Sequence, residues 1–87
     1  MTQQDDKTWA ALAEPNRRLL IDHLLTSHKT TASSLAAKVP FTRQAVTKHL
    51  NILTTAGLVK PEQHGREVIY TIQADELSKA AKAMANM

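Results

Sequence analysis

The chain contains no cysteine, so disulfide bonds and thiolate metal sites are excluded, and the redox compartment is left undetermined. Aromatic residues are almost as scarce, with only Trp9, Phe41 and Tyr70. We therefore expect a core built from aliphatic side chains and alanine, a composition that favours helices. Within 87 residues we expect one domain over 1–87, whose small core would gain stability from dimerisation.

Long apolar runs are missing as well. No stretch approaches the about 20 apolar residues that a helix needs to cross a bilayer. The first seven residues, Met1–Lys7, are polar and acidic and do not have the basic start and apolar run of a signal peptide. We expect a cytoplasmic protein that does not associate with membranes.

Groups that carry catalysis are also few. There is no cysteine nucleophile, no glycine-rich phosphate loop and no paired carboxylates in a plausible cleft. Asp22 and His23 are adjacent in a predicted helix, so their side chains point in different directions and do not form a dyad. We expect no enzymatic activity, no cofactor and no metal.

Positive charge is concentrated in the middle of the chain. Between Pro15 and Lys60 there are seven Lys and Arg residues and one acid, Asp22, which leaves a net charge of +6 in a chain whose total is +3. The acidic residues gather at the two ends and after Lys60. A basic middle with acidic flanks indicates a surface for a polyanion.

The stretch from Phe41 to Gly57 predicts a helix over about 43–56 with both ends marked. Thr42 is a plausible N-cap, because its hydroxyl can accept a hydrogen bond from an amide of the first turn. Gly57 suits the exit, since glycine adopts positive φ at little cost. Val46, Leu50 and Leu53 recur at spacings of four and three, which predicts one buried stripe.

The opposite face of this helix carries cations and hydrogen-bonding side chains and no acid: Arg43, Gln44, Thr47, Lys48 and Asn51. Arg reads guanine edges, Gln and Asn can pair with adenine, and the Thr methyl suits thymine. An ordinary solvated helix face is the alternative, and for this helix alone the two interpretations are about equally good. The neighbouring segments favour base reading.

Three shorter helices are predicted before it. The first runs from about residue 5 to 13, and the second from Pro15 to about Ser27, with Leu20, Ile21, Leu24 and Leu25 as its buried stripe. Lys29-Thr30-Thr31 reads as a polar break, and Thr30 or Thr31 could cap a third helix that reaches about Lys38. Pro40 ends that helix, and the short connection to Thr42 is typical of a helix-turn-helix.

Two extended runs follow Gly57, at 58–62 and 67–72, and predict a hairpin. His64-Gly65 is a credible tight turn, and Pro61 marks the first strand as an edge because proline donates no amide bond. A hairpin directly behind a recognition-type helix is a wing. Its tip carries His64 and Arg66, which suit the minor groove or a phosphate, although a solvated turn would explain both residues too.

The last segment, about 74–86, predicts a terminal helix with acids in the first turn, and Asp75 is placed to pair with Lys79. A helix of this kind is marginal alone. The two terminal helices, at about 5–13 and 74–86, carry apolar side chains that so small a monomer would not fully bury. We expect them to form a dimer interface: Trp9, Leu12, Leu77, Ala81 and Met84. For Trp9 the alternative is a place in the intramolecular core.

Four segments, in this order and spacing, resemble the ArsR (arsenical-resistance repressor) family of bacterial winged-helix regulators: Leu12–Ile21, Gln44–Leu50, Leu53–Val59 and Gly65–Tyr70. The resemblance covers nearly the whole chain. It implies a mainly α fold with a small β-hairpin, in the order helix, helix, helix-turn-helix, wing, helix. It also implies a homodimer joined by the first and last helices, and a repressor that blocks a promoter.

The chain departs from the metal-sensing members of that family. The segment Thr31–Leu35, where those members carry a cysteine motif, contains no cysteine, and the last helix contains no histidine. His23 and His28 lie five apart, off the spacing that puts two ligands on one helix face, and we expect both at the surface. His49 is expected at the helix edge or against a phosphate. The sequence names no inducer.

The leading hypothesis is a sequence-specific regulator that binds double-stranded operator DNA. Residues expected in the major groove are Arg43, Gln44, Thr47 and Lys48. Residues expected to cap the helix or to contact phosphates or the minor groove are Thr42, Arg17, Arg18, Lys38, Lys60, His64 and Arg66. The alternative is a winged-helix module that binds an acidic protein partner.

Overall fold

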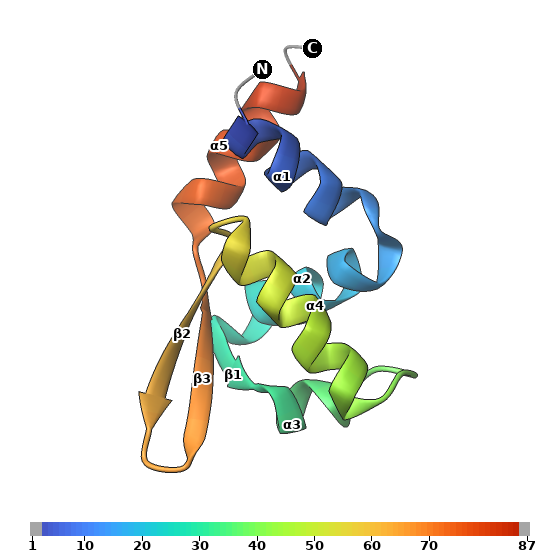
Figure 1. The fold of residues 1–87 in the computed structure, drawn as a ribbon, viewed down its shortest axis with the longest axis vertical. Helices are drawn as coiled ribbons and strands as arrows, with labels where there is room; N and C mark the ends of the chain where they lie inside the picture. The colour runs from blue at the N-terminus through green and yellow to red at the C-terminus, as the bar shows by residue number, and fades with distance from the viewer. Residues whose placement is uncertain (1–2, 86–87) are drawn as a thin grey trace.

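The computed structural model describes residues 3–85, which form five helices and one small sheet. In chain order they are α1 (Gln3–Ala13), α2 (Pro15–Ser27), β1 (Lys29–Thr31), α3 (Ala32–Ala36), α4 (Arg43–Thr55), β2 (Val59–His64), β3 (Glu67–Ile72) and α5 (Ala74–Ala85). This is the predicted winged helix-turn-helix order, with one added strand (Figure 1). Within this described part of the chain, every helix is too short or too polar to span a bilayer.

Local capping explains where the second and third helices begin. The Glu14 carboxylate accepts a hydrogen bond from the Arg17 amide at 2.9 Å, and Pro15 occupies the first turn, where its missing amide costs nothing. Thr31 caps α3 by accepting from the Ser34 amide at 3.1 Å. The predicted extension of α3 to Lys38 is wrong: the helix ends at Ala36, and residues 37–38 form a turn.

The sheet has three strands, in the order β1-β3-β2, and not the two of a simple hairpin. Lys29-Thr30-Thr31, predicted to be only a polar break, pairs antiparallel with β3, so that Thr30 lies opposite Tyr70. The Ile72 amide also donates to the His28 carbonyl at 3.0 Å. The wing is therefore attached to α2. The prediction that Pro61 marks an edge strand is confirmed, because β2 pairs only with β3.

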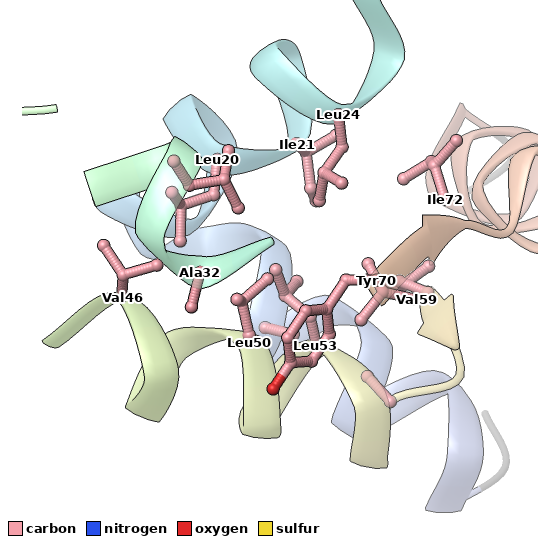
Figure 2. Packing of buried hydrophobic residues seen from close by; sticks show 14 residues of the cluster. Leu20, Ile21, Leu24, Ala32, Val46, Leu50, Leu53, Val59, Tyr70 and Ile72 are labelled. Carbon is pink, nitrogen blue, oxygen red and sulfur yellow. The ribbon is translucent and has the colours of Figure 1, made fainter. Parts of the chain in front are cut away.

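The core lies between α2, α3, α4 and the base of the sheet (Figure 2). Val46, Leu50 and Leu53 of α4 are fully buried, as predicted. Leu20, Ile21 and Leu24 face them from α2. The prediction for Leu25 is wrong, since 43% of its surface is exposed. At about 100° per residue, Leu25 lies at the edge of the stripe that Leu20, Ile21 and Leu24 form, so its side chain is only partly covered.

The corner between α1 and α2 is held by two arginines. Arg17 donates from Nε to the Ala11 carbonyl at 2.8 Å and from Nη2 to the Ala10 carbonyl at 3.1 Å. Arg18 donates to the carbonyls of Leu12 at 2.6 Å and Ala13 at 3.2 Å. The last four carbonyls of a helix have no partner within it, and guanidinium groups supply both hydrogen bonds and compensating charge.

The terminal helices α1 and α5 lie side by side at one end of the molecule, far from the tip of the wing (Figure 1). Trp9 of α1 is 46% exposed, so its alternative place in the core is ruled out within the monomer. Leu12 and Leu77 pack partly on the core, and Ala81 is exposed. The Met84 side chain lies outside the described residues. Lys79 pairs with Glu76 at 3.3 Å and not with Asp75 as predicted.

Candidate nucleic-acid interface

Helix α4 begins where the sequence predicts. The Thr42 hydroxyl accepts from the Ala45 amide at 3.1 Å, which fixes the first turn. The chain leaves the helix at Gly57 with φ +80, a conformation that glycine adopts readily. Both ends of the recognition helix are thus set by local chemistry, as predicted.

Burial of one side of α4 leaves the polar side outward. Arg43, Gln44, Lys48 and Asn51 are exposed and Thr47 is half-buried. Helix α4 contains no acidic residue, so a polyanion meets no repulsion along this face. The geometry confirms that the predicted base-reading residues share one accessible face; whether they contact bases stays a prediction.

The wing tip differs by one residue from its predicted turn. His64 and Glu67 form the last pair of the hairpin, so the two turn residues are Gly65 and Arg66, and not His64 and Gly65. Gly65 has φ +62, and the Gln63 side-chain amide donates to its carbonyl at 2.7 Å. His64 lies 3.4 Å from a Glu62 oxygen. Arg66 is exposed in the turn at the far end of the wing (Figure 1).

A hollow of about 190 Å³ lies between the wing and the start of α4. Arg43 and Arg66 both line it, together with Ser33 from the first turn of α3. Two guanidinium groups and a hydroxyl suit a phosphate oxygen, although Glu67 also lies on this rim. Ser33 was not among the predicted site residues. Its only sequence signal is its place in the first turn of the helix before the recognition helix.

The remaining predicted cations differ in their solvent exposure and in their hydrogen bonds to the protein. Lys38 is exposed in the turn after α3, and Lys60 is exposed on the edge strand β2. The Arg17 side chain is instead half-buried and bonded to α1, and Arg18 is bonded there as well. The helix-capping role of both arginines was missed, because the carbonyls they bind lie around a corner of the chain.

His49 links α4 to that corner. The Arg17 Nη1 lies 3.3 Å from His49 Nδ1, and the Phe41 ring meets the His49 ring edge-on at 5.7 Å between centroids. A guanidinium can only donate, so Nδ1 is the acceptor in this contact. Glu14 Oε2 is 3.9 Å from the same nitrogen, too far for a hydrogen bond. His49 therefore belongs to the helix edge, one of its two predicted places.

The Glu14 carboxyl is a titratable group whose surroundings have a clear net effect on its pKa. Partial desolvation acts to raise its pKa, but hydrogen bonds from the amides of Asn16 and Arg17 favour the ionised form, as does the charge of Arg17. Together these lower the pKa of Glu14 from its ordinary value of 4.5. Across the described residues, no three His, Cys, Asp or Glu side chains gather closely enough to hold a metal ion.

Comparison with known proteins agrees with this geometry. The chain matches no protein-family model. It is 30% identical to the uncharacterized HTH-type transcriptional regulator YuzN of Bacillus subtilis, covering 94% of this chain and 96% of that protein. It is 35% identical to the HTH-type transcriptional regulator Rv2034 of Mycobacterium tuberculosis, over 84% and 67% of the two chains. The transcriptional repressor SdpR of Bacillus subtilis is 26% identical, over 93% and 89%.

Solved structures give the same result. A possible transcriptional regulator for arsenical resistance superposes with a TM-score of 0.82 at 38% identity, covering 92% of this chain and 82% of the other. An ArsR-like regulator from Rhodococcus sp. RHA1 gives 0.75 at 36% identity, over 95% and 77%. The homodimeric winged helix-turn-helix DNA-binding domain Mb0332 of Mycobacterium bovis, a possible ArsR-family regulator, gives 0.75 at 25% identity, over 94% and 76%. With its capped recognition helix and wing, the chain belongs to the ArsR family of winged helix-turn-helix transcriptional regulators.

Proposed function

We propose that this protein is a homodimeric repressor that binds a specific operator, with α4 in the major groove and the wing tip against the adjacent backbone or minor groove. Arg43, Gln44, Thr47 and Lys48 read base edges, and Arg66 and His64 contact the minor groove or a phosphate. Lys38 and Lys60 contact phosphates. SdpR, a relative named as a repressor, supports the direction of regulation.

The observation that carries the proposal is the outward face of α4. This face is accessible, lacks acidic residues and is continuous through Arg43 with the hollow that Arg66 lines at the wing. A base-reading surface needs donors and acceptors on a rigid element with cations at its border, and α4 supplies both. Arg17 is bonded to the α1 corner and Arg18 to the same helix end, so any phosphate contact by either would use its remaining N–H groups.

The dimer part of the proposal rests on the terminal helices. Trp9 presents an exposed indole on α1, beside Leu12, at the end of the molecule opposite the wing tip. The homodimeric Mb0332 domain has the same fold. A symmetric pair joined through α1 and α5, with Leu77 and Ala81 in the contact, would set two recognition helices about one DNA turn apart, or a multiple of it.

A module that binds an acidic protein partner is the competing function, because the same basic face would suit it. We propose DNA binding because the relatives are regulators of transcription, and for the same reason we propose a binding protein and not an enzyme. As an operator-binding protein of bacterial type, it would act in the cytoplasm.

Fluorescence anisotropy against the DNA upstream of its own gene, and against a scrambled duplex, tests the proposal. Both duplexes are titrated at two salt concentrations with wild type and with a Gln44→Ala/Thr47→Ala variant. We expect tight, salt-sensitive binding to the upstream duplex that the variant loses, while its weak binding to the scrambled duplex persists. Equal weak binding to both duplexes, unchanged in the variant, would contradict base reading by α4 at this DNA and favour a protein partner.

A further inference from the structure

A second surface feature lies beside the reading face. An open groove of about 670 Å³ runs between α1 and α4, along three turns of α4 from Gln44 to Thr55. At one end the Thr8 hydroxyl donates to the Ala56 carbonyl at 3.4 Å, which joins the two helices. Nearer the middle, Arg17 joins them again through the Ala11 carbonyl and His49. The groove is therefore bordered by fixed contacts.

Its floor and walls are apolar where the two helices approach each other. Ala10 and Ala11 line it from α1, and Ile52 of α4 and Ala56, directly after α4, line it as well. Three of these four residues are alanines, and their short side chains leave the space unfilled. Ile52 is half-buried although it packs against the core, so part of its surface faces the groove. An apolar body laid here would cover surface that water now contacts.

The polar lining has one sign of charge. Lys7 enters from α1 and Lys48 from α4, Arg17 lies between the helices, and none of the described side chains that line the groove is acidic. Glu14 offsets part of the Arg17 charge from outside the groove, which leaves the two lysines as its free cations. A cationic groove with apolar walls matches the chemistry of an amphipathic anion.

We propose that this groove binds an amphipathic organic anion, a carboxylate with an aryl or alkyl body, and that the bound anion competes with operator DNA. The carboxylate lies between Lys7 and Lys48, and the apolar body lies against Ala10 and Ile52. Competition follows from shared residues, because Gln44, Thr47, Lys48 and Asn51 line the groove and also form the reading face. This second part rests on the proposed DNA-binding function; the binding site itself does not.

Amide NMR spectra of the protein titrated with phenylbutyrate test the site without any DNA. We expect saturable shifts confined to α1 and α4, with much weaker effects from the neutral amide phenylbutyramide and from inorganic phosphate. Shifts centred on α5 or on the outer surface of α1 around Trp9, or equal effects of the neutral amide, would overturn the site. Phosphate alone moving the same amides as strongly would also overturn it, since the apolar walls would then contribute nothing.

Two variants sharpen the result. Ala10→Leu places a good helix former in the groove, and we expect the dissociation constant for phenylbutyrate to rise about tenfold or more because the space is taken. Lys7→Gln should weaken binding about two- to fivefold, the size of one exposed charge pair, while Lys29→Gln on β1 should not change it. Folding of each variant is verified by its amide spectrum, and Lys7→Gln removes the charge without placing a larger side chain in the groove.

Competition is measured separately by displacement of the fluorescent upstream duplex. Phenylbutyrate should release the duplex from wild type but not from Ala10→Leu, whose reading face is intact. Saturable NMR binding without displacement would overturn the competition. Failure of wild type to bind any duplex would contradict the proposed function and leave the NMR test of the groove unaffected, so the two failures are distinguishable.

Discussion

Arg17 of α2 and His49 of the recognition helix are in direct contact, with Nη1 3.3 Å from Nδ1. The same guanidinium bonds the carbonyls of Ala10 and Ala11 at the end of α1. One side chain therefore joins the helix proposed for dimerisation to the helix proposed for base reading. Arg17 is half-buried, so its loss would leave carbonyls and a ring nitrogen without their partner.

Removing Arg17 should destabilise the fold. We expect Arg17→Ala to lower the free energy of unfolding by about 1–3 kcal/mol, because partly buried acceptors lose charged donors. Arg17→Lys should recover little of this, since an ammonium cannot reach three acceptors in the fork geometry of a guanidinium. Urea unfolding measures both, with Lys29→Ala as the exposed control. An Arg17→Ala midpoint equal to wild type would contradict the role.

The depressed pKa of Glu14 predicts a pH dependence of stability. A carboxyl whose folded-state pKa is lowered stabilises the fold fully above its unfolded pKa, near 4.5, and loses that contribution as pH falls through the folded value. Wild type should therefore exceed Glu14→Gln in stability at pH about 6, and the difference should shrink on going below about 4.5. Urea unfolding of both at several pH values tests this, with Glu76→Gln as the control. A difference that grows on acidification would contradict it.

Trp9 should control the oligomeric state. We expect Trp9→Ala to weaken the dimer by about 2 kcal/mol or about thirtyfold in dissociation constant, as for a buried aromatic anchor. Leu25→Ala is the matched control, because Leu25 is similarly exposed but lies on α2 and outside the proposed interface. Sedimentation equilibrium over a range of concentrations measures both. Equal effects of the two substitutions would show that the dimer does not use this face of α1.

Arg66 at the wing tip should act on DNA through charge. Arg66→Ala should weaken binding to upstream and scrambled duplexes alike and reduce the slope of log affinity against log salt by about 0.9. Lys29→Ala removes a cation outside the proposed interface and should leave the slope unchanged. Anisotropy titrations at several salt concentrations provide the slopes. A loss for the upstream duplex alone would mean that Arg66 reads a base and not a phosphate.

The elements predicted best from sequence are those set by local signals. Thr42, the Val46-Leu50-Leu53 stripe and Gly57 define α4 without help from the rest of the chain. Strand β1 could not be predicted, because three polar residues show no alternation and become a strand only by pairing with β3. The predicted hairpin turn, His64-Gly65, begins one residue before the observed turn, because a glycine at either turn position satisfies the same local preference.

The candidate site divides in the same way. The outward set on α4 follows from helical periodicity, so sequence alone identifies its members. The capping by Arg17 and Arg18, and the groove between α1 and α4, depend on where two helices meet after folding. Neither has a local pattern. The role of an arginine as a phosphate contact or as a helix cap is decided by what lies within reach of its side chain.

The short strand β1 has a mechanical consequence for the wing. It pairs with residues 69–71 of β3. The β2–β3 pairs from Val59–Ile72 to Glu62–Ile69 therefore lie in or next to a three-stranded part of the sheet, which is anchored to α2. Only the pairs Gln63–Val68 and His64–Glu67 and the turn extend beyond it. At about 3.3 Å per residue, this gives a free arm of about 10 Å. The wing is thus a short hairpin on an anchored three-stranded base. This base keeps a constant angle to α4, and the tip beyond it is free to adjust to a groove of the proposed DNA partner.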